Sequence, residues 1–166
     1  MGKNFSSSPK KKSFLDTLPQ DCIATSDIYT RSKFNFSYLD TNQAGQNFID
    51  WNTTSGNSKL VKLIDKLKEY TRQPLSFWKN QKIGKGKQGG RGKRQHCLEI
   101  YGDFPSKSAF THPNHVPEDV LWGRFRIDCD TRLAGFILPE DINHPNLDSN
   151  TFYIVFLDEN HEFYQS

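Results

Sequence analysis

The sequence is poor in cysteine, and its few cysteines are far apart. Cys22, Cys97 and Cys129 are the only three among 166 residues, and they form no Cys-x-x-Cys pair. This spacing supports neither a zinc knuckle nor a dithiol redox motif. We therefore expect no metal and no cofactor, and we expect reduced thiols in a cytoplasmic protein.

Long apolar runs are missing as well. No stretch approaches the roughly 18 apolar residues that a membrane-spanning helix needs, so we expect no contact with a membrane. The opening "MGKNFSSSPKKKSFLDTLP" is basic but lacks the apolar core of a secretion signal. The Walker spacing of a phosphate-binding loop is absent too, although "GKGK" occurs at 84–87.

Acidic residues are absent from one long stretch. The net charge is only +3, but the segment from Lys79 to Arg94 has seven basic residues and no acidic one. Its five glycines argue against helix or strand and let a ligand approach the backbone. Charge runs are most often solvated, but this one favours nucleic acid as the partner. The candidate RNA-binding residues of this segment are Lys85, Lys87, Arg91, Lys93 and Arg94.

Hydrophobic residues make up 34 % of the chain, a low share that indicates some tail or loop. Residues 1–32 are polar and carry a run of three lysines, so we interpret them as a flexible basic tail or arm. Residues 33–166 have the patterning of a single domain. A long basic, glycine-rich loop insertion occupies the region around 75–120 within that domain.

Periodicity predicts the elements of the domain. "KFNFSYLD" alternates like a strand, "AGQNFIDWN" favours a short helix, and a longer helix begins at Asn57 or Ser58 and stops before Pro74. Further strands are expected in "HCLEIY", "VLWGRFRID", "RLAGFIL" and "TFYIVFLD", with a loop over 103–119. The order predicts an α+β fold. We expect an antiparallel sheet of four to five strands, with two N-terminal helices packed on one face.

Three arginines gather on the predicted hairpin. Arg124 and Arg126 alternate with Phe125 and Ile127, so both arginines share one face of the strand. Arg132 opens the next strand. A sheet face that binds phosphate and a plain solvated face predict the same pattern, and both interpretations remain open.

These segments resemble the RelE/ParE superfamily of small toxins, in particular the YoeB-like ribosome-dependent mRNA interferases. In that family an Arg-Ile pair, four turn residues and an Arg-Leu pair follow one another, as do Arg126-Ile127 and Arg132-Leu133 here. "FYIVFLDENHEFY" resembles the family's closing strand, which ends in a histidine and a tyrosine. The resemblance covers residues 33–166 apart from the long insertion. It implies a RelE-like fold, similar to microbial ribonucleases, and an endoribonuclease activity.

Metal-independent RNA cleavage needs a base for the ribose 2′-OH, cations for the phosphorane-like transition state, and an acid for the leaving 5′-oxygen. The resemblance makes Arg132 the phosphate clamp, with Arg126 beside it, and His161 the general acid. Tyr164 would stack on a base or donate a hydrogen bond to the phosphate. Glu99 is the best placed carboxylate for the general base.

Each of these residues also has a plainer interpretation. Arg132 can be an exposed strand arginine, or one paired with Asp128 or Asp130. Arg126 can belong to a solvated face. We interpret Arg124 as a peripheral RNA contact or as a residue without a role at the site.

His161 can be an ordinary turn residue. Asp158, Glu159 and Glu162 surround it in the sequence, and carboxylates raise the pKa of a neighbouring histidine. Tyr164 can simply pack at the C-terminus.

Three other histidines compete with Glu99 for the role of base, namely His96, His112 and His115. "HPNH" at 112–115 has a spacing of three, but no third ligand lies near it in the sequence. We therefore keep Glu99 as the candidate.

The sequence leaves three functions open. The first, which the family resemblance implies, is a toxin-like mRNA interferase that cleaves mRNA on the ribosome and is covered by a cognate antitoxin protein. The second is a non-catalytic RNA- or DNA-binding module on the same scaffold. The third is a protein-interaction module whose basic loop docks on an acidic partner.

Overall fold

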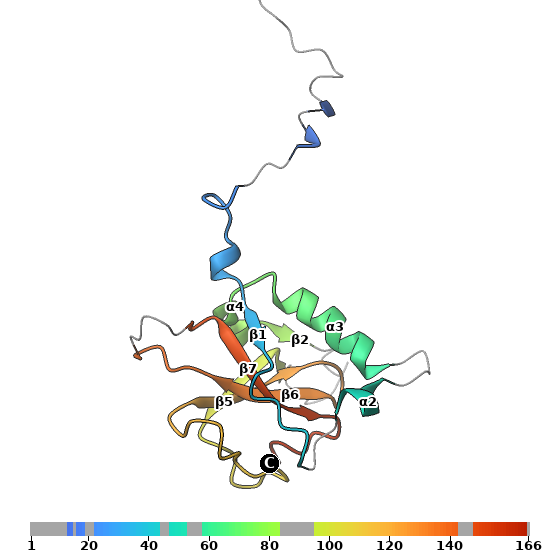
Figure 1. Cartoon of the computed structure of the whole chain (residues 1–166), viewed down its shortest axis with the longest axis vertical. Coiled ribbons are helices and arrows are strands. Elements are labelled where there is room, and N and C mark those ends of the chain that lie inside the picture. Colours follow the sequence, from blue (N-terminus) through green and yellow to red (C-terminus); the bar gives the residue numbers. More distant parts are fainter. Residues whose placement is uncertain are drawn as a thin grey trace, which may run out of the picture.

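The computed structural model describes residues 13–14, 16–18, 22–43, 47–52, 58–83, 95–142 and 148–165. They form a mixed α+β fold with a five-stranded sheet and three α-helices (Figure 1). The elements are a 3-10 turn η1 (Ile28–Thr30), β1 (Lys33–Asn35), α2 (Phe48–Trp51), α3 (Lys59–Tyr70), α4 (Leu75–Asn80), β2 (Lys82–Ile83), β3 (Gln95–His96), β4 (Leu98–Gly102), β5 (Leu121–Arg126), β6 (Arg132–Ile137) and β7 (Thr151–Asp158).

The sheet has the order β1-β7-β6-β5-β4, and it is mixed, not antiparallel as the sequence predicted. β1 runs parallel to β7, with Phe34 opposite Phe152. The other neighbours are antiparallel. Parallel neighbours need a long connection between them, and here most of the domain separates β1 from β7. Alternation within a strand contains no information about the direction of a partner so far away.

β1 is shorter than the alternating pattern "KFNFSYLD" predicted. Asn35 ends the strand because its side-chain oxygen accepts a hydrogen bond from the backbone N–H of Ser37 at 2.8 Å. This Asx turn diverts the backbone from the ladder. The strands predicted around β4, β5, β6 and β7 are all present.

The short helix α2 begins with a capping box. The side chain of Asn47 accepts from the backbone N–H groups of Ile49 and Asp50, and the Asp50 carboxylate accepts from the N–H of Asn47. These bonds satisfy donors that a helix start otherwise leaves open. The two helices that the sequence predicted correspond to α2 and α3.

A third helix, α4, lies where the sequence predicted a loop. Pro74 does not end α3, which stops at Tyr70, but precedes the first turn of α4. Trp78 of α4 donates its indole N–H to the carbonyl of Tyr70 at 2.7 Å. This bond satisfies a carbonyl at the end of α3 and fixes the two helices to each other.

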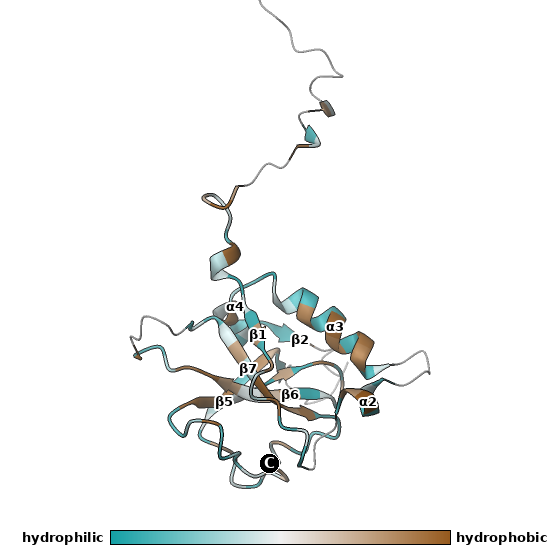
Figure 2. Cartoon of the chain, in the orientation of Figure 1, coloured by the Kyte–Doolittle hydropathy of each residue, from teal (hydrophilic) through white to brown (hydrophobic). Residues whose placement is uncertain are grey.

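Helix residues and one set of strand residues form the first hydrophobic core. Figure 2 shows hydrophobic residues concentrated on β5 and β7, with hydrophobic and hydrophilic residues both present along α3. The buried members of this core are Trp51, Leu63, Tyr70, Leu75, Trp78, Cys97, Leu98, Phe125, Ile127, Leu133, Ile137, Phe152, Ile154 and Leu157.

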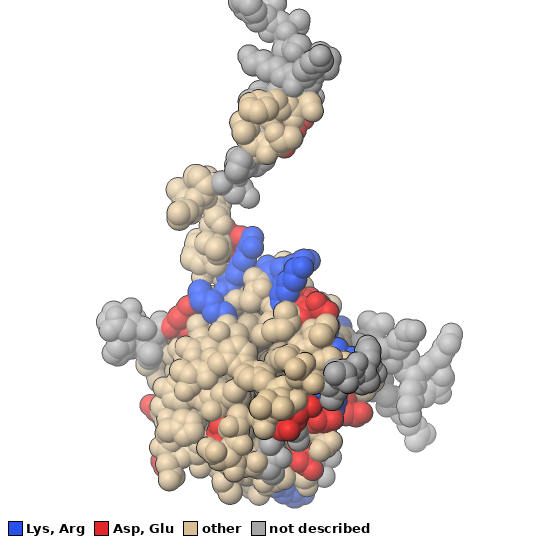
Figure 3. All heavy atoms as spheres, turned by 45° about the vertical axis from the view of Figure 1, so that its right-hand side comes forward, with Lys and Arg blue, Asp and Glu red and all other residues tan. Residues whose placement is uncertain are grey.

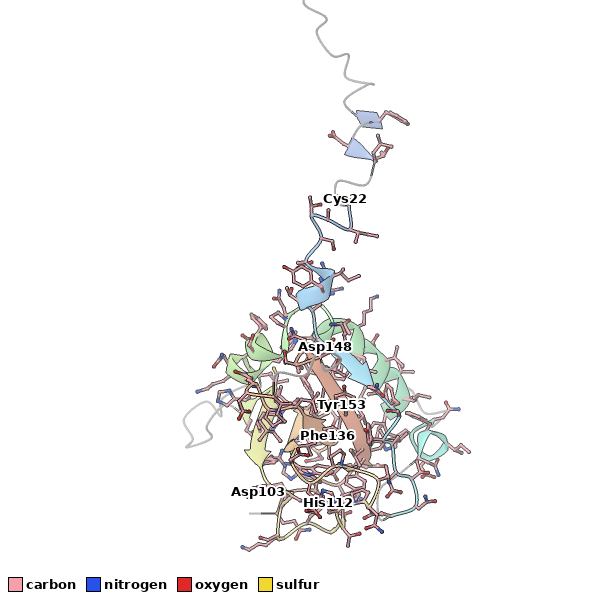
Figure 4. All side chains as sticks on the ribbon, turned by 60° about the vertical axis from the view of Figure 1, so that its left-hand side comes forward. Cys22, Asp103, His112, Phe136, Asp148 and Tyr153 are labelled. Atoms are coloured by element: carbon pink, nitrogen blue, oxygen red, sulfur yellow. The ribbon has the colours of Figure 1, made fainter. Side chains whose placement is uncertain are left out.

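The alternate strand residues form a second core on the opposite side of the sheet. Loop 103–120 and the segment after β7 cover it, and Phe163 of that segment is fully buried. Phe136 and Tyr153, on neighbouring strands, stack with ring centroids 4.9 Å apart (Figure 4). The buried members are Phe110, Val116, Val120, Trp122, Ala134, Phe136, Val155, Phe156 and Phe163.

The N-terminal segment leaves the body of the protein at Ser32. Ser32 is buried and bonds through its backbone and side chain to the carbonyl of Gln73. Before it, the described part of the segment extends away from the sheet, with Cys22 far from the body (Figures 1 and 4). Within the described ranges, every helix is too short or too polar to cross a membrane.

Candidate functional site

The three hairpin arginines lie at one end of the sheet, on the face of the second core. Strand register places Glu99 of β4 opposite Arg124 of β5, and Arg126 opposite Arg132 of β6. Arg132 is in turn opposite Asp158 at the end of β7. Because side chains of directly opposed residues share a face, the sheet brings these groups together.

Arg124 is the centre of this cluster. Its side chain is only 7 % exposed, and its Nε and Nη2 each lie 2.8 Å from Oε2 of Glu99. Its Nη1 lies 3.4 Å from Nδ1 of His161. Arg124 therefore bridges the residues that the sequence proposed as base and acid. The sequence predicted only a peripheral place for Arg124, because the alternation that places an arginine on a face does not show that the face is covered.

Glu99 presents one occupied and one open oxygen. Arg124 and the hydroxyl of Tyr101, at 3.0 Å, donate to Oε2. Within the described part of the chain, the hydrogen bonds and the ion pair of Glu99 all use Oε2 and leave Oε1 open. Burial raises the pKa of this carboxyl, but the Arg124 guanidinium and the hydrogen bonds outweigh burial and leave the pKa below its usual value. Glu99 is thus ionised at neutral pH.

His161 is held in a backbone conformation that few side chains adopt. Its φ is +63°, in the left-handed region, which costs on the order of 1 kcal/mol for a residue other than glycine. The Asp158 carboxylate fixes the turn by accepting from the backbone N–H groups of Glu162 at 2.8 Å and Phe163 at 3.0 Å. The buried ring of Phe163 anchors the same turn. In this turn, Nδ1 of the imidazole lies 3.4 Å from Nη1 of Arg124.

The pKa of His161 is lowered, because the effects that lower it outweigh the charge of Asp158, which raises it as the sequence predicted. Burial lowers it most, followed by the charges of Arg124 and Arg132. The nearby carboxylates are engaged elsewhere: Glu159 forms an ion pair with Lys59 of α3, and Asp158 accepts from backbone N–H groups.

Hydrogen bonding also constrains the tautomer of His161. A guanidinium can only donate, so Nδ1 accepts from Arg124 and the ring proton of the neutral imidazole is on Nε2. In the free protein His161 is therefore a neutral donor through Nε2. It becomes an acid only when something raises its pKa.

Arg132 is a buried residue that holds the hairpin turn. It is 2 % exposed. Its Nη1 donates to the carbonyls of Asp128 and Thr131, both at 2.9 Å, and its Nη2 donates to the carbonyl of Cys129 at 3.1 Å. Burial and the charges of Arg126 and Arg124 lower its pKa to about 10. Neither Asp128 nor Asp130 forms an ion pair with it, since the Asp128 carboxylate pairs with Lys62 of α3 at 3.0 Å.

Arg126 is the cation of the cluster with the most available donors. Its side chain is half-buried, and among the described residues its guanidinium makes one long hydrogen bond, 3.5 Å to the carbonyl of Asp128. Its own carbonyl accepts from the hydroxyl of Tyr70, which ties the end of β5 to α3. Its charge acts on both Arg132 and Glu99.

Tyr164 lies beside the cluster, over Tyr101. The two rings are stacked, with centroids 4.3 Å apart and an interplanar angle of 7°. The guanidinium carbon of Arg124 is 5.5 Å from the Tyr101 centroid and 5.7 Å from that of Tyr164. A cavity of about 570 Å³ opens here, lined by Lys79, His96, Leu98, Glu99, Ile100, Tyr101, Arg124 and Tyr164.

The other candidate residues lie away from the cluster or outside the described part of the chain. Lys85, Lys87, Arg91, Lys93 and Arg94 lie outside the described residues. His112 packs against Phe104 and Trp122, and His115 contacts the backbone carbonyl of Tyr38. Across the described ranges, no three His, Cys, Asp or Glu side chains gather as metal ligands would.

The surface on the side of α3 does not show a single large patch of one charge sign. Figure 3 brings this side forward and shows mostly neutral residues, with Lys and Arg gathered near the exit of the N-terminal segment.

Comparisons with protein-family models, curated proteins and solved structures found no match to the chain. The best indication of a function is therefore the geometry of the cluster around Arg124.

Proposed function

We propose that this protein is a metal-independent endoribonuclease that cleaves RNA by attack of a ribose 2′-OH on the adjacent phosphate. The observation that carries the proposal is the linked set Glu99, Arg124 and His161, with Arg126 beside it. A carboxylate, an imidazole and unneutralised guanidinium groups within one cluster are the groups that this reaction requires.

The open oxygen of Glu99 is the base in this proposal. Oε1 removes the proton from the 2′-OH while Arg124 holds Oε2 in place. The 2′-oxygen then bonds to phosphorus, the bond from phosphorus to the 5′-oxygen breaks, and His161 gives its proton to that oxygen. The products are a 2′,3′-cyclic phosphate and a free 5′-hydroxyl.

The three arginines have different proposed roles, which follow from how many of their donors are already bonded within the protein. Arg126 touches the phosphate, because its donors are available and a guanidinium binds phosphate bidentately. Arg132 is proposed to act through its charge and by holding the turn, since its Nη groups are bonded to carbonyls. Arg124 is a positioning residue that joins the base to the acid.

Substrate binding raises the pKa of His161, so that this residue becomes protonated and can act as the general acid. In the free protein the pKa of His161 is lowered by burial and by the charges of Arg124 and Arg132. An anionic phosphate beside Arg126 offsets those charges and raises the pKa of His161. When RNA is bound, Nδ1 of His161 takes a proton from solvent and gives up its hydrogen bond from Arg124, and the imidazolium then donates its Nε2 proton to the leaving oxygen. Proton donation is therefore coupled to substrate binding.

The wider assignment depends on the family resemblance. It adds mRNA as the substrate, the ribosome as the place of cleavage, and a cognate antitoxin as the partner that covers the site. The basic segment between Ile83 and Gln95 would contribute salt-dependent affinity for RNA backbone.

A cleavage assay with purified protein tests the proposal. We expect a short single-stranded RNA to be cut in EDTA and to yield 2′,3′-cyclic phosphate ends, and a 2′-deoxy residue at the cut to block cleavage. His161→Asn keeps the left-handed backbone and an amide donor but cannot transfer a proton, so it should lower the rate at least about 100-fold. Glu99→Gln should have a comparable effect. His115→Asn, away from the cluster, is the matched control.

A second candidate function has its own supporting observation. Arg132 is buried and His161 is not protonated in the free protein, which suits a non-catalytic RNA-binding module. If RNA binds but is cut neither by the free protein nor with ribosomes present, the nuclease proposal is wrong and the protein is a non-catalytic RNA-binding module. Mapping 5′ ends of cellular RNA after brief induction gives the same decision in cells.

A further inference from the structure

A separate cavity lies at the end of the β5–β6 hairpin opposite to the arginine cluster. Arg126 and Arg132 are paired at one end of these strands, and Leu121 and Ile137 are paired at the other end. The cavity lies at this second end, beside the second core, and has a volume of about 220 Å³. Its lining residues are Tyr38, Pro117, Asp119, Val120, Phe136, Leu138, Ile142 and Tyr153.

Three aromatic rings of the lining form a corner. Phe136 and Tyr153, on the neighbouring strands β6 and β7, are stacked with an interplanar angle of 9° (Figure 4). The ring of Tyr38 stands at 77° to Phe136 and at 86° to Tyr153, with centroids 5.1 Å and 5.7 Å away. His115 stacks on Tyr38 with centroids 6.2 Å apart and supports its ring. Such a corner attracts an organic cation, because the faces of aromatic rings carry partial negative charge.

Carboxylates lie in and beside this lining. Residues 117–120 before β5 read Pro-Glu-Asp-Val, and residues 139–142 after β6 read Pro-Glu-Asp-Ile, so one motif occurs twice at this end of the hairpin. All four acidic residues are exposed, and Asp119 lines the cavity itself. Among the described residues, the only ion pair of the four is that of Glu140 with Lys79 at 3.2 Å, which is exposed and contributes little. The surroundings of the cavity therefore favour a cation.

The lining suits an alkylammonium group better than a metal ion. A hard metal cation needs several oxygen ligands at once, whereas Asp119 is the only carboxylate in the lining, and the described residues contain no cluster of potential metal ligands. Val120, Leu138 and Ile142 instead offer apolar surface to a methylene chain. An ammonium group on such a chain can lie against the aromatic rings while it faces a carboxylate.

From these observations we propose that the cavity binds an alkylammonium group, that is, a positively charged nitrogen on a methylene chain. A free linear polyamine and a lysine side chain of a basic polypeptide both carry this group, and the carboxylates beside the cavity favour a ligand with more than one of them. The inference does not rest on the proposed function, because this cavity and the arginine cluster lie at opposite ends of the hairpin.

NMR titration of the full chain with n-butylammonium and with 1-butanol tests the cavity. The two probes have the same carbon chain and differ in charge. We expect butylammonium to bind at least about 5-fold more tightly than butanol, and to shift the resonances of the lining residues, because aromatic faces and a carboxylate attract only the charged probe.

Variants of two lining residues test the source of the attraction. Asp119→Asn, at an exposed position, should weaken the Kd of butylammonium about 3-fold or more and leave that of butanol within about 1.5-fold. Tyr38→Leu keeps an apolar side chain but removes the ring, and it should weaken butylammonium about 3-fold to 30-fold. Tyr38→Phe keeps the ring and should bind like wild type.

The matched control is Asp65→Asn, which removes an exposed carboxylate from α3, on the other side of the sheet. It should leave the Kd of butylammonium within about 1.5-fold, because distant exposed charges are screened. Equal binding of the two probes would overturn the inference. So would an Asp119→Asn variant that binds butylammonium like wild type, or resonance shifts confined to residues outside the cavity.

Spermidine and the peptide acetyl-Lys-Lys-Lys-amide distinguish the two sources of the group, since both carry the same number of ammonium groups. Tighter binding of spermidine supports a free polyamine, and tighter binding of the peptide supports a lysine side chain. The tighter of the two should exceed butylammonium at least about 10-fold at low salt and lose this advantage at high salt, because the carboxylates beside the cavity are exposed. If neither exceeds butylammonium, the inference of a ligand with several ammonium groups is wrong.

Discussion

The sheet face opposite the helices has two halves that are buried in different ways. In one half, Trp122 and Phe156 pack against Phe163, and Phe136 packs against Trp122. In the other half, on the same strands, Arg124 and Arg132 are almost as deeply buried. We call these the aromatic half and the arginine half. The first is neutral and closely packed, whereas the second holds cations with few carboxylates to balance them.

The difference shows that burial stabilises the fold in the aromatic half, whereas burial of the guanidinium groups in the arginine half has a free-energy cost that hydrogen bonds must offset. Burying a phenylalanine ring is favourable without any polar partner, although the buried indole N–H of Trp122 has none among the described residues. A buried guanidinium needs hydrogen bonds for its donors, which Arg132 obtains only from the carbonyls of its own turn. Repulsion from Arg126 and Arg124 then adds to burial in lowering its pKa. An anion that binds at such a site offsets the repulsion among the guanidinium groups and stabilises the folded protein.

The aromatic half should show the largest loss of stability on truncation. Phe156 is fully buried, and its ring lies 4.4 Å from that of Phe110, centroid to centroid. Phe156→Ala leaves a cavity and should lower the free energy of unfolding by about 3–5 kcal/mol, measured by urea denaturation. A loss below about 1 kcal/mol would show that this half is not a packed core.

In the arginine half, a single substitution should cost more than a matched pair. Arg124→Met leaves the Glu99 carboxylate without its partner and should lower the free energy of unfolding by about 3 kcal/mol. Glu99→Leu combined with Arg124→Met removes both charges and should restore most of that loss. If the double variant is no more stable than Arg124→Met, the ion pair is not the cause.

The sequence predicted the elements whose signal is local. The helix over Lys59–Tyr70 and the strands β5, β6 and β7 follow from periodicity, because each buries one face against a core. It did not predict α4, because this helix adjoins the glycine-rich basic segment from which a loop was inferred for the whole region. It also did not predict that β1 runs parallel to β7, which depends on residues more than a hundred positions apart.

The site was predicted in part. Spacing and resemblance selected Arg126, Arg132, Glu99 and His161, and the structure brings these residues together. Neither could show which guanidinium is buried, because Arg124 contacts the segment after β7, which is distant in the sequence, and Arg132 bonds to the carbonyls of its own turn. The central place of Arg124 therefore appeared only when the sheet was assembled. Its position opposite Glu99 is a cross-strand pairing that no local pattern contains.

An anion should stabilise the arginine half and have no comparable effect elsewhere. Phosphate at about 100 times its Kd should raise the free energy of unfolding by about 2.7 kcal/mol. Arg126→Ala should remove most of this gain while changing stability without phosphate by no more than about 0.5 kcal/mol, since its guanidinium makes only one long hydrogen bond. Thermal unfolding with and without phosphate measures both quantities, with Arg72→Ala, an exposed arginine, as the control. An equal phosphate response in wild type and Arg126→Ala would mean that Arg126 is not the anion ligand.

The smallest effect concerns the turn that holds Arg132. Asp128 Oδ1 accepts from the backbone N–H of Thr131 at 3.0 Å, and Oδ2 pairs with Lys62 at 3.0 Å. Burial opposes ionisation, but these bonds outweigh it and lower the pKa of Asp128 from 3.8 to about 2. Its contribution to stability is therefore complete above about pH 4 and is lost as the pH falls through about 2.

Asp128→Asn retains the oxygen that Thr131 uses and loses the charge that Lys62 uses. At neutral pH we expect it to cost on the order of 1 kcal/mol, because the pair is partly exposed to solvent. Between about pH 4 and pH 2 the variant should lose less stability than wild type, because it has no carboxylate to protonate at this position. Urea denaturation across this range measures the difference. Parallel acid limbs for the two proteins would show that the charge of Asp128 does not hold the turn, and the Arg132 carbonyl bonds would then have to do so alone.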